Sequence, residues 1–199
     1  MHARFRIAAL LLVSAFALTA CSKTPVEPER LLGAPHDFSA PESTLAVLVH
    51  AVHDRNVGVF TLCLADSLTE GREFHASFDP ADVALFVSEG GVPPADWRRI
   101  DEFGFLPQLL SVVPNPFYDL ELTPDVARGG IVAVGGPTEK WLYNLLYRVE
   151  SGGTAVVDGA VGLTIERVGS DGEFKITYWE DRRAGGPVRT WGLARLRSR

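Results

Sequence analysis

Apolar positions in the segment after residue 40 recur at the spacing of an amphipathic helix. Ser39 and Glu42 stand three residues apart around Pro41, a pattern that predicts a capping box and a first helical turn. The apolar residues that follow the i, i+3, i+4, i+7 spacing of one buried helix face are Leu45, Leu48, Val49 and Val52. We therefore expect a helix that begins near residue 41 and packs one side against a core.

Further helical segments are expected before residue 110. A short helix is predicted over residues 59–64, directly after the first. Another helix is predicted to begin at Asp79, which suits an N-cap, and Pro80, which suits the first helical position. It is predicted to end at Gly90-Gly91. A less regular helical stretch is predicted around four apolar residues, Trp97, Ile100, Phe103 and Leu106.

From about residue 117 the period changes to that of strands. Residues 117–123 alternate weakly, and residues 140–150 alternate strongly. The residues expected on one side of the second segment are Trp141, Tyr143, Leu145, Tyr147 and Val149. Three more strands are predicted, of which the last covers residues 186–198. Arg195, Arg197 and Arg199 alternate at its end and would lie together on a solvated edge. Helices followed by an antiparallel meander predict an α+β fold, with N-terminal helices packed on a curved antiparallel sheet.

The N-terminus has the three parts of a secretory leader. Arg4 and Arg6 precede an uncharged apolar run over residues 7–18, which is too short to span a membrane. The segment Leu18-Thr19-Ala20-Cys21 resembles the lipobox of bacterial lipoprotein precursors, in which the cysteine is lipidated and becomes the first residue. Ser22 is not the aspartate that typically retains such proteins in the inner membrane. The resemblance implies an outer-membrane lipoprotein with its domain in the periplasm.

This interpretation divides the chain into three parts. Residues 1–20 are the signal peptide, residues 21–40 are the lipidated Cys21 with a proline-containing tether, and residues 41–199 are one α+β domain. Without the two arginines of the signal peptide, 17 of the 19 basic residues remain against 25 acidic ones, a net charge of −8. So acidic a chain is not built to bind nucleic acid.

Cysteine usage excludes cysteine-based chemistry. With Cys21 lipidated, Cys63 is the only thiol, so neither an intrachain disulfide nor a cysteine zinc cluster can form. The apolar surroundings of Cys63 predict a buried, unreactive side chain. No cofactor is expected.

Several short patches are similar to one family. They are residues 78–82 (FDPAD), Trp97 with Glu102, residues 178–183 (YWEDRR) and residues 190–192 (TWG). Together with the order of elements, they resemble the nuclear transport factor 2-like (NTF2-like, cystatin-like cone) superfamily and, more narrowly, bacterial lipoproteins that carry such a domain. The superfamily includes isomerases, cyclases and dehydratases as well as domains that bind without catalysis, so the resemblance implies a fold and leaves the function open.

Two groups of side chains are candidates for a site. His50, His53 and Asp54 lie on the polar flank of the first helix, but two imidazoles without a third ligand make a weak metal site, and none is predicted. Asp158 interrupts an apolar strand. If it faced the concave side of the sheet its pKa would rise and it would suit a general base, as the family's isomerases use carboxylates; we favour the outward, solvated orientation.

Aromatic residues of the predicted strands suggest an apolar pocket. The candidate pocket residues are Tyr143, Tyr147, Asp158, Tyr178 and Trp179, whereas Trp191 is assigned to the core and residues 180–183 to exposed ion pairs. No convergent catalytic set can be identified, so we expect a non-catalytic domain that binds a small apolar ligand or an envelope protein. The alternative is an isomerase- or hydratase-type enzyme with a pocket carboxylate as base.

Overall fold

The structure is a computed structural model that describes residues 36–112, 117–134, 139–185 and 189–199. The predicted signal peptide, Cys21 and most of the tether lie outside the described residues. Within them, no helix is both long and apolar enough to cross a membrane. Phe38, ahead of the first helix, is already buried in the core, and its carbonyl accepts a hydrogen bond from the backbone N–H of Phe174 at 2.8 Å.

The helices come mainly from the first part of the chain, as the pattern predicted, and one more closes it. They are α1 (Pro41–His53), α2 (Val57–Leu62), α3 (Ser67–Glu70), α4 (Pro80–Ser88), α5 (Arg99–Leu109), the 3-10 helix η1 (Val126–Arg128) and α6 (Trp191–Leu196). At α4 the prediction is confirmed, because Pro80 begins the helix and the Asp79 carboxylate accepts a hydrogen bond from the N–H of Ala81.

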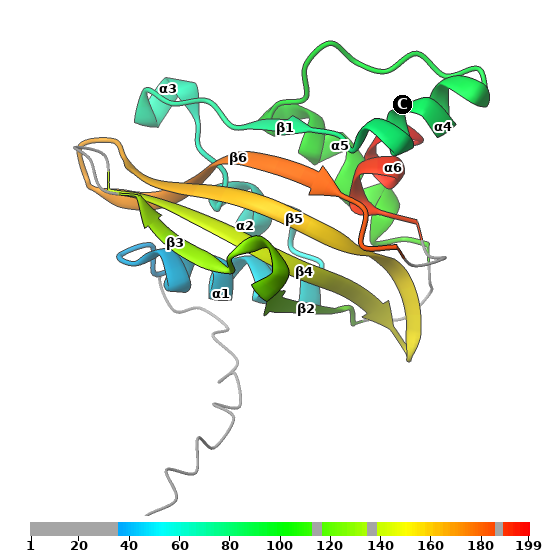
Figure 1. The fold of residues 1–199 in the computed structure, drawn as a ribbon. Coiled ribbons are helices and arrows are strands. Elements are labelled where there is room, and N and C mark those ends of the chain that lie inside the picture. The colour runs from blue at the N-terminus through cyan, green and yellow to red at the C-terminus, as the bar shows by residue number, and fades with distance from the viewer. Residues whose placement is uncertain (1–35, 113–116, 135–138, 186–188) are drawn as a thin grey trace, which may run out of the picture. The chain divides into compact units, whose positions relative to one another are not determined.

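The strands form one sheet in the order β1-β6-β5-β4-β2, with β3 paired to β4 beside it. Their bounds are β1 (His75–Ser77), β2 (Asp119–Pro124), β3 (Ile131–Val134), β4 (Lys140–Ser151), β5 (Thr154–Val168) and β6 (Glu173–Arg182). All pairs are antiparallel except β1 with β6. Figure 1 shows β4, β5 and β6 as long neighbouring strands, with α4, α5 and α6 gathered near the C-terminal end of β6. The predicted α+β class is confirmed.

Alternation along the long strands separates two faces of the sheet. On β4, Tyr143, Leu145, Tyr147 and Val149 are buried, as predicted, whereas Leu146 and Arg148 between them are exposed. The buried side is the helix face of the sheet, and we call the other side the open face. The core therefore lies between the helices and only one face of the sheet.

Two predicted local features of the helices are wrong. The N-cap of α1 is Ala40, without a side-chain cap, because the Glu42 carboxylate instead accepts a hydrogen bond from the Tyr143 hydroxyl at 2.8 Å. On α5, Ile100 is 67% exposed and Phe103 is also exposed, whereas Glu102 is buried. The helix is turned so that this carboxylate, rather than those apolar residues, faces the interior.

The short helix α2 begins two residues earlier than predicted. Asn56 caps it, with its side-chain oxygen accepting a hydrogen bond from the N–H of Val59 at 3.0 Å. The residue after the helix, Cys63, is fully buried, and burial raises the pKa of its thiol to about 12.

We predict that Cys63 does not react with a thiol reagent while the protein is folded, because both access and thiolate are lacking. In the Cys21→Ser background, where Cys63 is the only cysteine, a disulfide-exchange reagent should label the protein only in concentrated guanidinium. Adding Ser170→Cys in the exposed β5–β6 turn should give rapid labelling of one thiol per chain. Rapid labelling of native Cys63 itself would contradict the prediction.

Candidate functional site

The five predicted pocket residues do not share one surface. Tyr143, Tyr147 and Trp179 are buried on the helix face of the sheet. Tyr178 is 39% exposed and Asp158 pairs in register with Arg148, so both lie on the open face. The physical reason is that successive side chains of a strand point to opposite sides, so Tyr178 cannot join its neighbour Trp179.

The helix face of the sheet is filled at this point by Trp191, the first residue of α6. Its ring centroid lies 5.3 Å from that of Trp179, 6.0 Å from that of Phe60 and 6.1 Å from that of Tyr147. The backbone N–H of Trp191 also donates a hydrogen bond to the Tyr147 hydroxyl at 2.7 Å. The prediction that Trp191 belongs to the core is confirmed, and this tryptophan occupies the space that an internal pocket would need.

Two glycines permit this close packing. A Cβ at Gly159 on β5 would lie 2.6 Å from the hydroxyl oxygen of Tyr147, and one at Gly192 would lie 2.9 Å from the Cβ of Asp181. Both distances are below any real contact, so a side chain at either position would push α6 or Tyr147 away from the sheet.

Behind Trp191 lies a fully buried ion network, which we call the Arg195 network: Arg195, Glu102 and Asp181. The guanidinium of Arg195 contacts Glu102 of α5 and Asp181 of β6, with both N–O distances 2.6 Å. The indole N–H of Trp97 donates to Glu102 at 2.9 Å, and that of Trp179 donates to Asp181 at 2.8 Å. The network therefore joins α5 to α6 through the Arg195–Glu102 ion pair, and α6 to β6 through a charge-assisted hydrogen bond from Arg195 to Asp181.

Both carboxyl groups of the network are perturbed. Burial raises the pKa of Glu102 and of Asp181, and the positive charge of Arg195 opposes the rise in each case. Such carboxyls are candidates for acid–base chemistry, but a general base must reach its substrate. The side chains of Glu102 and Arg195 are both 0% exposed, so the arrangement holds the fold together and is closed to a ligand.

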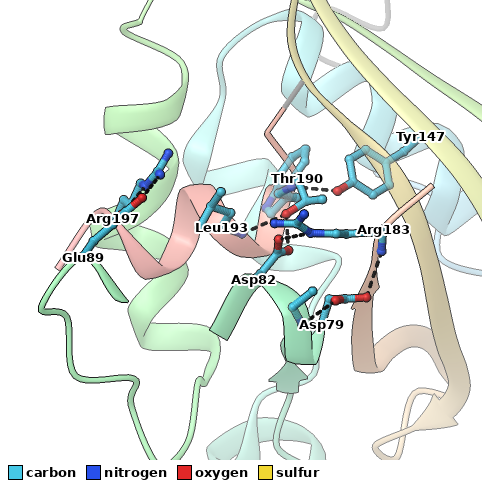
Figure 2. A network of polar contacts seen from close by, with 10 residues as sticks. Asp79, Asp82, Glu89, Tyr147, Arg183, Thr190, Leu193 and Arg197 are labelled. Carbon is cyan, nitrogen blue, oxygen red and sulfur yellow. Dashed lines mark hydrogen bonds and ion pairs between the residues drawn. The ribbon is translucent and has the colours of Figure 1, made fainter. Parts of the chain in front are cut away.

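A third carboxylate, that of Asp82, fixes the start of α6. Asp82 of α4 accepts hydrogen bonds from the hydroxyl of Thr190 and from Nε of Arg183, the latter at 2.6 Å. Thr190 in turn caps α6, its hydroxyl oxygen accepting from the N–H of Leu193 at 3.0 Å. Figure 2 shows Asp82, Thr190 and Arg183 converging, with Asp79 beside them.

The last predicted strand is therefore wrong, because residues 191–196 are helical. The alternation predicted that three arginines share one solvated edge. In the structure the three side chains instead lie apart and bind different acidic residues. Arg195 is buried in its network, Arg197 pairs with Glu89, and Arg199 pairs with Asp101 at 2.6 Å. The prediction of exposed pairs over residues 180–183 is likewise wrong for Asp181, which is buried.

The four short patches that carried the family resemblance meet around α6. Residues 78–82 contribute Asp82, residues 178–183 contribute Trp179 and Asp181, and residues 190–192 contribute the cap and Trp191, while Trp97 and Glu102 complete the Arg195 network. These patches therefore supply the contacts that hold α6 on the sheet. They do not form an accessible site.

The open face of the sheet carries polar side chains at its centre. Arg182 lies across β5 and bonds to Asn144 of β4 at 2.8 Å and to Glu180 at 2.6 Å. A Cβ at Gly162 would lie 2.7 Å from this guanidinium, so the glycine provides its path. Asp158 is on the same face, outside the core between the sheet and the helices.

The first-helix histidines do not form a metal site. Nδ1 of His53 lies 3.3 Å from the carboxylate of Asp119, in a half-exposed pair. Among the described residues there is no group of three or more His, Cys, Asp or Glu side chains arranged to hold a metal ion.

One hollow on the described surface combines charge with apolar walls. It lies between α5 and α6, has a volume of about 150 Å³, and is bordered by Arg189 and Arg197. Its walls include Phe105, Leu109 and Ala194, which are buried side chains of the two helices. Arg189 was not among the predicted site residues, because its segment was interpreted as part of a strand and α6 had not been recognised.

Known structures are similar to this chain at the level of the fold. An NTF2-like protein of unknown function from Pseudomonas putida KT2440 has 12% identity, a TM-score of 0.46 and a match over 71% of this chain and 82% of its own. The Kfla4162 protein from Kribbella flavida has 10% identity, a TM-score of 0.48 and a match over 72% and 87%. A function-unknown protein from Mycobacterium tuberculosis has 12% identity, a TM-score of 0.47 and a match over 71% and 68%.

No protein-family model matches the chain, and no curated protein matches its sequence. The structural similarities concern the arrangement of helices and sheet alone. The function has to be argued from the residues of this chain.

Proposed function

We propose that this chain is a lipoprotein of the bacterial cell envelope, whose domain binds a small ligand or an envelope protein without catalysing a reaction. The anchor would be acyl groups on Cys21. Support comes from the charged start of the chain, the apolar run over residues 7–18 and the sequence Leu18-Thr19-Ala20-Cys21. Two or three acyl chains hold a protein on a membrane durably, because each buried methylene contributes about 0.8 kcal/mol.

One observation favours binding over catalysis: Trp191 fills the helix face of the sheet where a reaction pocket would be enclosed. It is completely buried among Trp179, Phe60 and Tyr147. The perturbed carboxyls behind it are bound to Arg195, and Asp158, the base of the enzymatic alternative, lies on the open face. A ligand would therefore contact the outer surface of the domain.

The anchor is tested with the full-length chain expressed in a diderm bacterium. The wild type should incorporate labelled palmitate and sediment with the outer membrane, whereas Cys21→Ser should lose the label, since no other thiol lies near the cleavage site. Ser22→Asp is the matched control, because it should keep the label and shift the protein to the inner membrane. A Cys21→Ser protein that still carried label and sedimented with the outer membrane would overturn the anchoring proposal.

A further inference from the structure

The hollow between α5 and α6 borders a cation that has no anionic partner in the described parts of the chain. Arg189 is half-buried at its edge. No side chain of residues 36–112, 117–134, 139–185 or 189–199 forms an ion pair or hydrogen bond with its guanidinium. Burial, and then the nearby positive charge of Arg197, lower the pKa of Arg189. Both effects make an arginine at this place unfavourable unless an anion joins it.

The second arginine of the hollow is already neutralised. Arg197 binds the carboxylate of Glu89 with two nitrogen atoms, one of them at 3.0 Å, as Figure 2 shows. As far as the described residues go, the hollow thus carries one uncompensated positive charge, that of Arg189. One charge matches a monoanion, whereas a dianion such as a phosphate ester would leave a negative charge over an apolar wall.

The rest of the lining of the hollow is mostly apolar and favours a ligand that has an apolar group beside its anionic group. Phe105, Leu109 and Ala194 are buried apolar side chains, and Val112 adds an exposed apolar rim. The volume of about 150 Å³ equals that of an apolar cavity able to hold a benzene molecule. Gln108 donates from Nε2 to the carbonyl of Ser198 at 3.3 Å, a bond that joins α5 to the end of α6 across the same hollow.

We propose that this hollow binds a carboxylate attached to an apolar group of about the size of a benzene ring, with Arg189 as the residue that pairs with the carboxylate. The inference rests on the binding function proposed above and names its site and ligand class. A guanidinium holds a carboxylate through two parallel N–H···O bonds, and the partial burial of Arg189 strengthens them relative to water. The apolar group displaces water from the three walls.

The test measures binding of 4-fluorobenzoate to the full-length protein by ¹⁹F NMR titration. Arg189→Gln should weaken binding at least tenfold, since a bidentate ionic pair is lost. Glu89→Gln should tighten binding severalfold, because it releases Arg197 to face the same anion, and a purely structural role for Arg189 would not produce this gain. Arg167→Gln, which removes an exposed arginine that pairs with Glu139 and does not border the hollow, is the matched control and should leave the affinity unchanged.

Two further probes define the chemistry. Neutral 4-fluorobenzamide should bind at least tenfold more weakly than the carboxylate. An acetylated peptide ending in phenylalanine tests whether the carboxylate belongs to the end of a protein chain, and the same peptide with an amidated C-terminus is its control. If the peptide with the free C-terminus binds more tightly than 4-fluorobenzoate, the hollow is assigned to protein C-termini.

The proposal is overturned if 4-fluorobenzoate does not bind, if Arg189→Gln binds it as tightly as the wild type, or if the benzamide binds equally well. None of these results bears on palmitate labelling of Cys21, so failure of the ligand class is distinguished from failure of the anchor.

Discussion

Replacing Arg195 with methionine is expected to destabilise the domain by about 3–5 kcal/mol, the range seen when one partner of a buried ion pair is removed. Methionine has a similar volume and leaves no large cavity, so the loss would be electrostatic. It arises because Glu102 and Asp181 stay fully buried without the guanidinium that now contacts both at 2.6 Å. Urea unfolding followed by circular dichroism measures the change.

Two further variants separate charge from packing. Adding Glu102→Gln and Asp181→Asn to Arg195→Met should recover part of the stability, because the amide oxygens still accept from the indole N–H groups of Trp97 and Trp179 and carry no charge. Arg148→Gln, which removes an exposed pair with Glu150, is the matched control and should change the stability little. If the triple variant were less stable than Arg195→Met alone, the electrostatic explanation would fail.

The loss in Arg195→Met should also depend on pH, in a direction that follows from the carboxyl groups. Burial raises the folded-state pKa of Glu102 and of Asp181 above the ordinary values. Without Arg195 the rise is larger, because the hydrogen bonds from the indole N–H groups of Trp97 and Trp179 then oppose it without the help of a positive charge. A raised carboxyl pKa stabilises the fold below the unfolded-state pKa, and this contribution is lost as the pH rises through the folded-state pKa. The difference in the free energy of unfolding between the wild type and Arg195→Met should therefore become smaller as the pH is lowered.

Replacing Trp191 with alanine should cost about 3–5 kcal/mol, since removing a large buried aromatic side chain loses its burial and leaves a cavity. Trp191 is fully buried and contacts the rings of Phe60, Tyr147 and Trp179. The hydrogen bond from its backbone N–H to the Tyr147 hydroxyl survives the change, so the loss measures packing.

The matched control is Trp141→Ala, at a tryptophan of β4 that is only partly buried, and it should cost clearly less. Thermal and urea unfolding of both variants make the comparison. Equal losses at the two tryptophans would show that Trp191 does not occupy a closed interior. The case against an internal pocket would then be lost as well.

Much of the fold followed from local pattern. The alternation over residues 140–150 placed Tyr143, Leu145 and Tyr147 on the buried side of β4, and Asp79-Pro80 marked the start of α4. These features depend on interactions between near neighbours in the chain, such as a cap two residues from its donor or side chains that alternate across a strand. Near-neighbour geometry can be derived from sequence spacing alone.

The end of the chain was decided by partners far away in sequence. Arg195, Arg197 and Arg199 alternate with other residues as they would on a strand, yet the segment is helical. Thr190 caps this helix, and its hydroxyl bonds to Asp82, 108 residues earlier. Arg195 enters the core only because Glu102 and Asp181 meet there from two other elements. A contact between residues so far apart in sequence leaves no local pattern, and the alternation of the arginines therefore led to the wrong prediction of a strand.

The candidate sites show the same division. The proposed lipid anchor at Cys21 stays a prediction from sequence, since a lipobox is a linear motif of four consecutive residues. Sequence alone also placed Trp191 in the core. Only the tertiary structure separated Tyr178 and Asp158 from Tyr143, Tyr147 and Trp179. Only the packing of α6 against α5 brought Arg189 beside apolar side chains, with no acidic partner among the described residues. A surface hollow forms where elements meet, so its lining is a property of packing rather than of any one segment.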